Sequence, residues 1–139
     1  MTFDELKERV IFQVNADSDD LDDYEPALDG YINAGYDQIV EAFLDEHLNT
    51  GNFYVSLAAP WDVPIVPEWT HIAIADYATY LVYRNGNPQK QQRGQQFLMQ
   101  FNDILSKCKA LRGKIEVDSE TGAITVKSKK PPQFFNVYL

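Results

Sequence analysis

Apolar and aromatic residues fill almost every position of residues 67–84, whose sequence is PEWTHIAIADYATYLVYR. A helix that is hydrophobic nearly all round must be surrounded by protein. The stretch is shorter than the roughly 20 residues that a membrane-spanning helix needs, and it contains Glu68, His71 and Asp76. We therefore predict that residues 67–84 form the central helix of a small bundle and not a membrane span.

Residues 2–14 and 88–112 carry apolar side chains at helical spacing, which predicts an amphipathic helix in each segment. Thr2 and Glu5 form a capping box, in which each side chain can bind a backbone N–H at the start of the first helix. Asn87 can cap the last helix, because its side-chain oxygen can accept from the first turn and a proline follows it. Both helices are expected to pack against the central one.

A further helix is predicted from Asp22 to near His47, with a strongly acidic outer side. Asp22 and Glu25 have the spacing of a capping pair, and Pro26 lies close enough to this start to be tolerated. Gly35 falls within the helix, where the missing side chain favours a close approach by a neighbouring backbone. The total is then four helices.

Residues 49–66 contain prolines that exclude a helix across most of the segment. Residues 53–57, FYVSL, could form a short strand. Trp61 has two interpretations: a wedge between this loop and the helices, which we favour, or an anchor at an interface with another protein. The two differ in whether the ring is buried within the subunit.

After the last helix the pattern alternates, and residues 114–127 predict a β-hairpin whose turn uses Gly122 for a positive φ. Residues 128–139 follow as a tail in which Pro131 and Pro132 favour an extended chain. Bulky apolar residues at its end could dock on a partner protein or fold back on the same domain. These residues are Phe134, Phe135, Val137, Tyr138 and Leu139.

Together these elements predict a mainly α fold, a small bundle of about four helices around residues 67–84 with a C-terminal hairpin and an extended tail. Residues 1–113 would form the helical part, 114–127 the hairpin and 128–139 the docking tail of a single domain overall. A chain of 139 residues can bury a core without a metal or a disulfide. Cys108, the only cysteine, could form no disulfide within the chain.

Charge is distributed unevenly along the chain, whose net charge is −9. Residues 1–46 hold fourteen acidic residues against two basic ones, a net charge of −12, whereas residues 85–139 carry a net charge of +5. The two ends could attract each other within one molecule, or the basic face of one copy could stack on the acidic face of the next in a ring. The excess of acid argues against general affinity for nucleic acid, because duplex binding depends on basic side chains that neutralise phosphates.

Candidate catalytic and metal-binding groups are few. Glu68 and His71 have the Glu-x-x-His spacing of a metal-binding helix, but a di-metal bundle needs this motif twice. Asp76 lies within the apolar helix, and a buried acid needs a partner, for which we expect a tyrosine or a basic side chain such as Arg93. The sequence has no nucleotide-binding glycine loop and no nucleophile elbow. We therefore predict no enzymatic activity, no metal and no cofactor.

Three stretches carry a resemblance to a known family. They are the acidic helix LDDYEPALDGYINAGYDQIVEAF, the central VPEWTHIAIADYATYLVYRNGNP and the following QRGQQFLMQFNDILSKC. Together with the proline-bounded loop and the reaching tail, they resemble the head-to-tail connector, or adaptor, proteins of tailed bacteriophages and prophages. The resemblance covers roughly residues 20–112.

The resemblance implies a structural virion protein without enzymatic activity, made in the host cytoplasm and finally located in the neck between capsid and tail. Members of the family assemble beneath the portal protein as a ring of about twelve copies. The ring extends the DNA channel, through which genomic DNA passes without sequence-specific binding, and it offers a docking surface to the next neck or tail protein. The family's C-terminal segments commonly reach the portal, a role that maps here onto residues 133–139.

Charge suggests two sets of functional residues. Part of the acidic set would face the DNA channel, because like charge repels phosphate; this set is Asp29, Asp37, Glu41 and Asp45. The basic candidates for the contact between ring neighbours are Lys90, Arg93, Lys107 and Arg112. The alternative function is that of a cytoplasmic helical regulatory or accessory protein that binds a host partner through the same aromatic tail.

Overall fold

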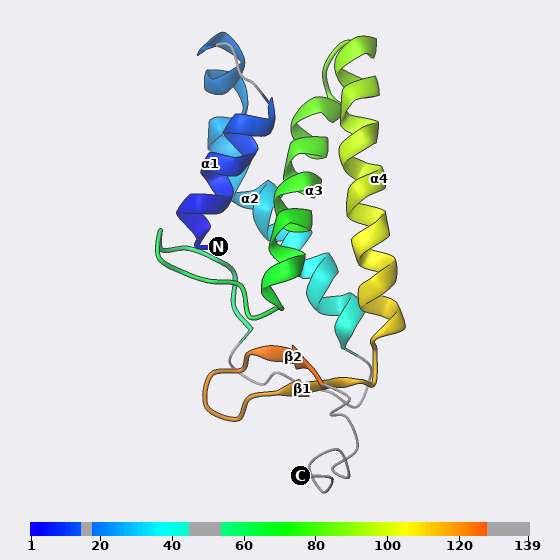
Figure 1. Ribbon diagram of the computed structural model, residues 1–139. Coiled ribbons are helices and arrows are strands. Elements are labelled where there is room, and N and C mark those ends of the chain that lie inside the picture. The colour runs from blue at the N-terminus through cyan, green and yellow to red at the C-terminus, as the bar shows by residue number, and fades with distance from the viewer. Residues whose placement is uncertain (15–17, 45–53, 128–139) are drawn as a thin grey trace, which may run out of the picture.

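The computed structural model describes residues 1–14, 18–44 and 54–127, and for residues 18–24 it describes the backbone alone. Within these ranges the protein is mainly helical, with a small antiparallel hairpin below the helices (Figure 1). This confirms the predicted fold class. The elements are α1 (Phe3–Val14), α2 (Ser18–Phe43), a 3-10 turn η2 (Glu68–Thr70), α3 (His71–Arg84), α4 (Pro88–Ala110), β1 (Ile115–Val117) and β2 (Ile124–Val126).

Helix α3 is the centre of the bundle, as its sequence predicts. It packs against α1, α2 and α4, and Figure 1 shows α1 and α4 on opposite sides of it. Nine of its 14 residues are buried, so it is enclosed on nearly every side. The α-helix begins at His71 and not at Pro67, because the first turn after the proline is the 3-10 turn η2.

Local capping signals fix the starts of α1 and α4. In α1 the Thr2 backbone N–H donates to Glu5 Oε1 at 2.9 Å, and the Glu5 N–H donates to Thr2 Oγ1 at 3.2 Å. In α4 the Asn87 side chain accepts from the Lys90 N–H at 2.9 Å. Both predicted caps are confirmed, since each uses only residues within one helical turn.

Helix α2 differs from its predicted bounds at both ends. It begins at Ser18 and passes through Pro26, so Asp22 and Glu25 lie inside the helix and do not cap it. Pro26 is the ninth residue of α2, beyond the first turn where a proline fits without loss, so it removes one hydrogen bond from the helix interior. The helix ends at Phe43, and His47 lies outside the described residues.

The predicted close approach at Gly35 is confirmed. A Cβ atom placed on Gly35 would lie 3.0 Å from the Ile74 carbonyl oxygen and 3.1 Å from Tyr77 Cβ. Both atoms belong to α3, so the missing side chain lets α2 and α3 approach closely at their crossing.

The predicted strand at residues 53–57 is wrong for its described part, residues 54–57, which pair with no other strand. The Asn33 side chain of α2 takes the place of a partner strand. Its oxygen accepts from the Leu57 N–H at 2.7 Å, and its amide nitrogen donates to the Leu57 carbonyl at 3.1 Å. One side chain therefore satisfies the backbone that a ladder would otherwise satisfy.

The hairpin forms as predicted and packs against the rest of the domain. Ile115 pairs with Val126 and Val117 with Ile124, and Gly122 has a φ of 73° in the turn. Ile115 and Ile124 are buried, and the Ile124 N–H donates to the Ile65 carbonyl at 2.6 Å. The hairpin is thus tied to the loop that precedes α3.

Candidate interaction surfaces

The predicted acidic residues form a stripe on α2. Asp29, Asp37 and Glu41 are exposed and lie eight and then four residues apart, which puts them on one side of the helix. The sequence of α2 contains no lysine or arginine. Asp45, the fourth member of the predicted set, lies outside the described residues.

Among the residues that the structure describes, one basic side chain pairs with the acidic stripe. Lys7 Nζ of α1 lies 2.8 Å from Asp29 Oδ1, which ties the beginning of the stripe to α1. Burial, and then the nearby charge of Glu41, raise the pKa of Asp37. Asp37 and Glu41, the two residues of the stripe that follow Asp29, are therefore like charges four residues apart on one helix.

The four predicted basic residues are not brought into one cluster. Arg93 and Lys107 are exposed on α4, fourteen residues apart along the helix, which is about 21 Å. Lys90 is half-buried at the start of the same helix. Arg112 turns toward α2 and donates from its guanidinium to the Glu41 and Ala42 carbonyls at 3.1 Å, so it caps the end of that helix.

Trp61 is exposed, and its favoured interpretation as a wedge against the helices is wrong. The side chain is 75% exposed at the tip of the loop. Backbone hydrogen bonds hold this loop instead: the Phe3 N–H donates to the Asp62 carbonyl at 2.7 Å and the Asp4 N–H to the Pro60 carbonyl at 3.0 Å. The ring is left free for a contact outside the subunit.

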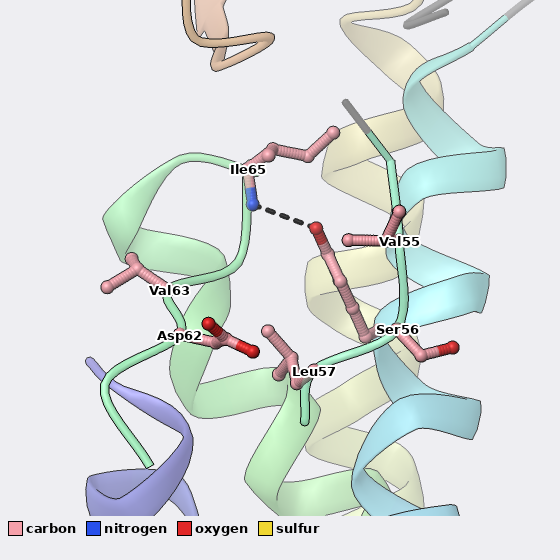
Figure 2. Close-up of a pocket in the computed structure, with 7 residues that line it drawn as sticks. Val55, Ser56, Leu57, Asp62, Val63 and Ile65 are labelled. Atoms are coloured by element: carbon pink, nitrogen blue, oxygen red, sulfur yellow. Dashed lines mark hydrogen bonds between the residues drawn. The ribbon is translucent and has the colours of Figure 1, made fainter. Parts of the chain in front are cut away.

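Figure 2 shows a small pocket between the two arms of this loop, Val55–Leu57 on one side and Asp62–Ile65 on the other. Its volume is about 120 Å³, below the roughly 300 Å³ at which ligand pockets begin. Tyr36 of α2 closes the pocket, since its hydroxyl accepts from the Ile65 N–H at 3.0 Å. The Asp62 carboxylate is occupied by the Ala58 and Ala59 N–H groups, which lower its pKa. This pocket holds the loop together.

A larger apolar hollow of about 390 Å³, which no sequence pattern predicted, lies where α4 ends beside the 3-10 turn. Trp69, Lys107, Ala110 and Leu111 line it. The Trp69 ring is 40% exposed, and its other side meets Phe43 edge to face at 6.2 Å. Sequence reasoning assigned Trp69 to the core, because a helix that is apolar nearly all round does not reveal which residues remain uncovered.

A polar cluster lies inside the bundle between α1 and α3. Asp76 is only 4% exposed, and its Oδ1 accepts from Gln13 Nε2 at 2.9 Å. The Gln13 oxygen in turn accepts from the Thr79 hydroxyl at 2.7 Å. The hydrogen-bond partner of Asp76 is therefore neither a tyrosine nor Arg93 but the neutral amide of Gln13 in α1, and a basic side chain, Arg9, acts on Asp76 only through its charge. Burial raises the pKa of Asp76 to about 6.

Glu68 and His71 are both engaged in contacts within the subunit. The Met1 amino group lies 2.8 Å from Glu68 Oε1 and 2.8 Å from His71 Nδ1, and His71 Nε2 donates to the Val66 carbonyl at 2.9 Å. Burial lowers the pKa of His71. Across residues 1–14, 25–44 and 54–127, no three His, Cys, Asp or Glu side chains come together as metal ligands would.

In comparisons with known proteins, no family model, no curated protein and no solved structure matches this chain. No helix in the described part of the chain is long and apolar enough to cross a membrane. The aromatic residues of the predicted docking tail, Phe134 to Leu139, lie outside the described residues.

Proposed function

We propose that this protein is a structural head-to-tail connector of a tailed bacteriophage or prophage, which forms a ring beneath the portal and has no enzymatic activity. The observation that carries the proposal is the separation of charge between two helices. Helix α2 has no basic residue and presents an acidic stripe, whereas α4 carries four basic residues and Asp103, a net charge of +3. Such polarity suits a contact in which unlike faces of identical copies meet.

The arrangement of the helices supports a head-to-tail contact. α1 and α4 are the two outer helices on either side of α3 (Figure 1), and each carries a large exposed apolar residue. Phe12 of α1 is 76% exposed and Met99 of α4 is 67% exposed. Single exposed apolar residues are ordinary on a protein surface. Each belongs to one of the helices that flank α3, so a ring contact between α1 of one copy and α4 of the next would give these residues something to pack against.

Two other features agree with a neck protein. The part of the acidic stripe that the contact between neighbours leaves uncovered would face the channel and repel DNA from its wall, and Asp37 and Glu41, which have no basic residue on their own helix, are the candidates for this part. The aromatic tail would reach the portal, and the exposed Trp61 would offer an anchor to a neighbour or to the next neck or tail protein.

Loss of the protein from the producing phage tests this function. A nonsense codon in place of Trp69 should yield DNA-leaking heads and free tails that accumulate separately, which negative-stain electron microscopy of the lysate would reveal. A suppressor strain that restores Trp69 is the control and should restore joined particles. Normal infectious particles from the nonsense mutant would reject the connector function and leave the cytoplasmic regulatory protein as the alternative.

A further inference from the structure

The apolar hollow beside Trp69 lies next to the point where the C-terminal tail begins. The Lys127 N–H donates to the Lys114 carbonyl at 2.8 Å, and the Lys114 N–H donates to the Leu111 carbonyl at 2.8 Å. Leu111 is one of the residues that line the hollow. Two backbone hydrogen bonds, from Lys127 to Lys114 and from Lys114 to Leu111, thus connect the last described residue to a residue of the hollow.

The length of the remaining chain allows its aromatic residues to return to the hollow. Twelve residues follow Lys127, and Phe134 is seven residues along them. Seven extended residues span up to about 24 Å. The lysines and prolines at the start of the tail would then act as the spacer, and the apolar residues from Phe134 onward would reach the hollow.

The chemistry of the hollow matches the tail better than the other segment that starts nearby. The hollow is an open surface depression of about 390 Å³, lined by a tryptophan, a leucine, an alanine and the stem of Lys107, so its lining is apolar. Residues 45–53, which follow the end of α2, are mostly polar: DEHLNTGNF. The tail ends in FFNVYL, with five bulky apolar side chains in six residues.

We propose that the hollow formed by Trp69, Lys107, Ala110 and Leu111 is the resting seat of residues 134–139 of the same chain. Covering Trp69 removes apolar surface from water in the free subunit. The tail would then have to leave the hollow before it could bind another protein. The hollow therefore keeps the apolar tail from binding other proteins in the free subunit. The seat itself does not depend on the identity of that partner.

Acrylamide quenching of Trp69 fluorescence in the isolated chain tests the seat. In the Trp61→Phe protein Trp69 is the only tryptophan, and excitation at a wavelength that tyrosine does not absorb isolates its emission. Deletion of residues 133–139 should raise its quenching constant roughly twofold, because a docked side chain excludes quencher from a residue that is otherwise 40% exposed. Adding the synthetic peptide QFFNVYL should reverse the change. The Trp69→Phe protein, which reports Trp61, should show no change on deletion.

A second pair of variants tests the hollow with the tail intact. Ala110→Glu places a charge in the hollow at an exposed helical position and should raise the quenching of Trp69 as the deletion does. Ser106→Glu, which adds the same charge to an exposed position of α4 outside the hollow, should not. Equal quenching with and without the tail would overturn the proposal. Protection that disappears on dilution would also overturn it, since the tail would then come from a second copy.

Discussion

Gln13 connects α1 to α3 at a point where the bundle buries a carboxyl group. Its amide donates to Asp76 and accepts from Thr79, so both ends of one side chain are satisfied by the central helix. The hydrogen bond from Gln13 and the charge of Arg9 favour the ionised carboxylate, but burial outweighs them and raises the pKa of Asp76 to about 6. The folded protein therefore holds a proton there more tightly than the unfolded chain does.

The stabilising contribution of this proton is complete below about pH 4 and is lost as the pH rises through about 6. Asp76→Asn keeps the acceptor oxygen for Gln13 but cannot ionise. The free energy of unfolding of the variant, minus that of the unchanged protein, should be roughly 2 kcal/mol larger at about pH 7.5 than at about pH 4.5. Urea unfolding followed by circular dichroism at both pH values measures this gain.

The prediction compares the variant with the unchanged protein because His71 makes stability depend on pH in the opposite direction. Burial lowers the pKa of His71, so its contribution is present above its ordinary pKa and is lost as the pH falls. This contribution is common to both proteins and cancels. Asp103→Asn, which changes an exposed carboxylate on α4, is the control. A gain for Asp76→Asn that does not vary with pH would contradict the prediction.

The side chain of Asn33 takes the place of a partner strand for Leu57. Its two hydrogen bonds to Leu57 hold the buried start of the loop against α2. Asn33→Ala leaves the Leu57 N–H and carbonyl without these partners, and we expect a loss of roughly 1–3 kcal/mol in the free energy of unfolding. Hydrogen exchange at the Leu57 amide should accelerate accordingly.

Asn102→Ala is the matched control for this change, because Asn102 is exposed on α4 and the substitution alters helix propensity equally. Equal stability of the Asn33 and Asn102 variants would mean that the loop is held by its other contacts, such as the bond from Ile65 to Tyr36.

At the scale of elements, two glycines of α2 distinguish helix propensity from helix packing. A Cβ at Gly30 would meet nothing within 4 Å, whereas at Gly35 it would press on the backbone of α3. Gly30→Ala should raise the free energy of unfolding by roughly 0.5–1 kcal/mol. Gly35→Ala has the same gain in propensity but adds an overpacking cost of about 1–3 kcal/mol, so it should be the less stable variant in urea unfolding. Equal stabilisation by both would show that α2 and α3 can separate without cost.

The elements that the sequence predicts well are those whose signals are local. The capping box at Thr2, the cap at Asn87 and the glycine turn of the hairpin each involve residues within a few positions of one another. The errors arise where a distant residue decides the outcome. Residues 54–57 have the composition of a strand, yet their partner is one asparagine in α2.

The candidate surfaces were less predictable than the helices for the same reason. The acidic stripe follows from helical spacing, so its exposure could be anticipated. The exposure of Trp61 could not, because the loop is held by backbone bonds to α1 that leave no mark on the sequence. Arg112 was grouped with the basic residues of α4 by charge, but the fold directs it to the end of α2.

At the scale of the whole molecule, the question is whether the two outer sides meet in a ring. Attraction between exposed charges is weak and screened by salt, so many copies of a contact must act together for it to matter. A closed ring provides this repetition, since every copy makes the same contact twice. The proposed contact should therefore weaken steeply with added salt.

Charge reversal on α4 tests the ring contact directly. Arg93 and Lys107 are both exposed and, fourteen residues apart, lie on one side of α4. Arg93→Glu with Lys107→Glu turns the net charge of α4 from +3 to −1, and it should abolish assembly of the protein on the portal because like charges then face each other. Lys114→Glu with Lys127→Glu makes the same change in charge at exposed positions next to the hairpin strands and should leave assembly intact. Native mass spectrometry of the protein with purified portal measures the number of bound copies. Loss of assembly in both double variants would trace the effect to net charge and not to the outer side of α4, whereas full assembly in both would remove α4 from the contact.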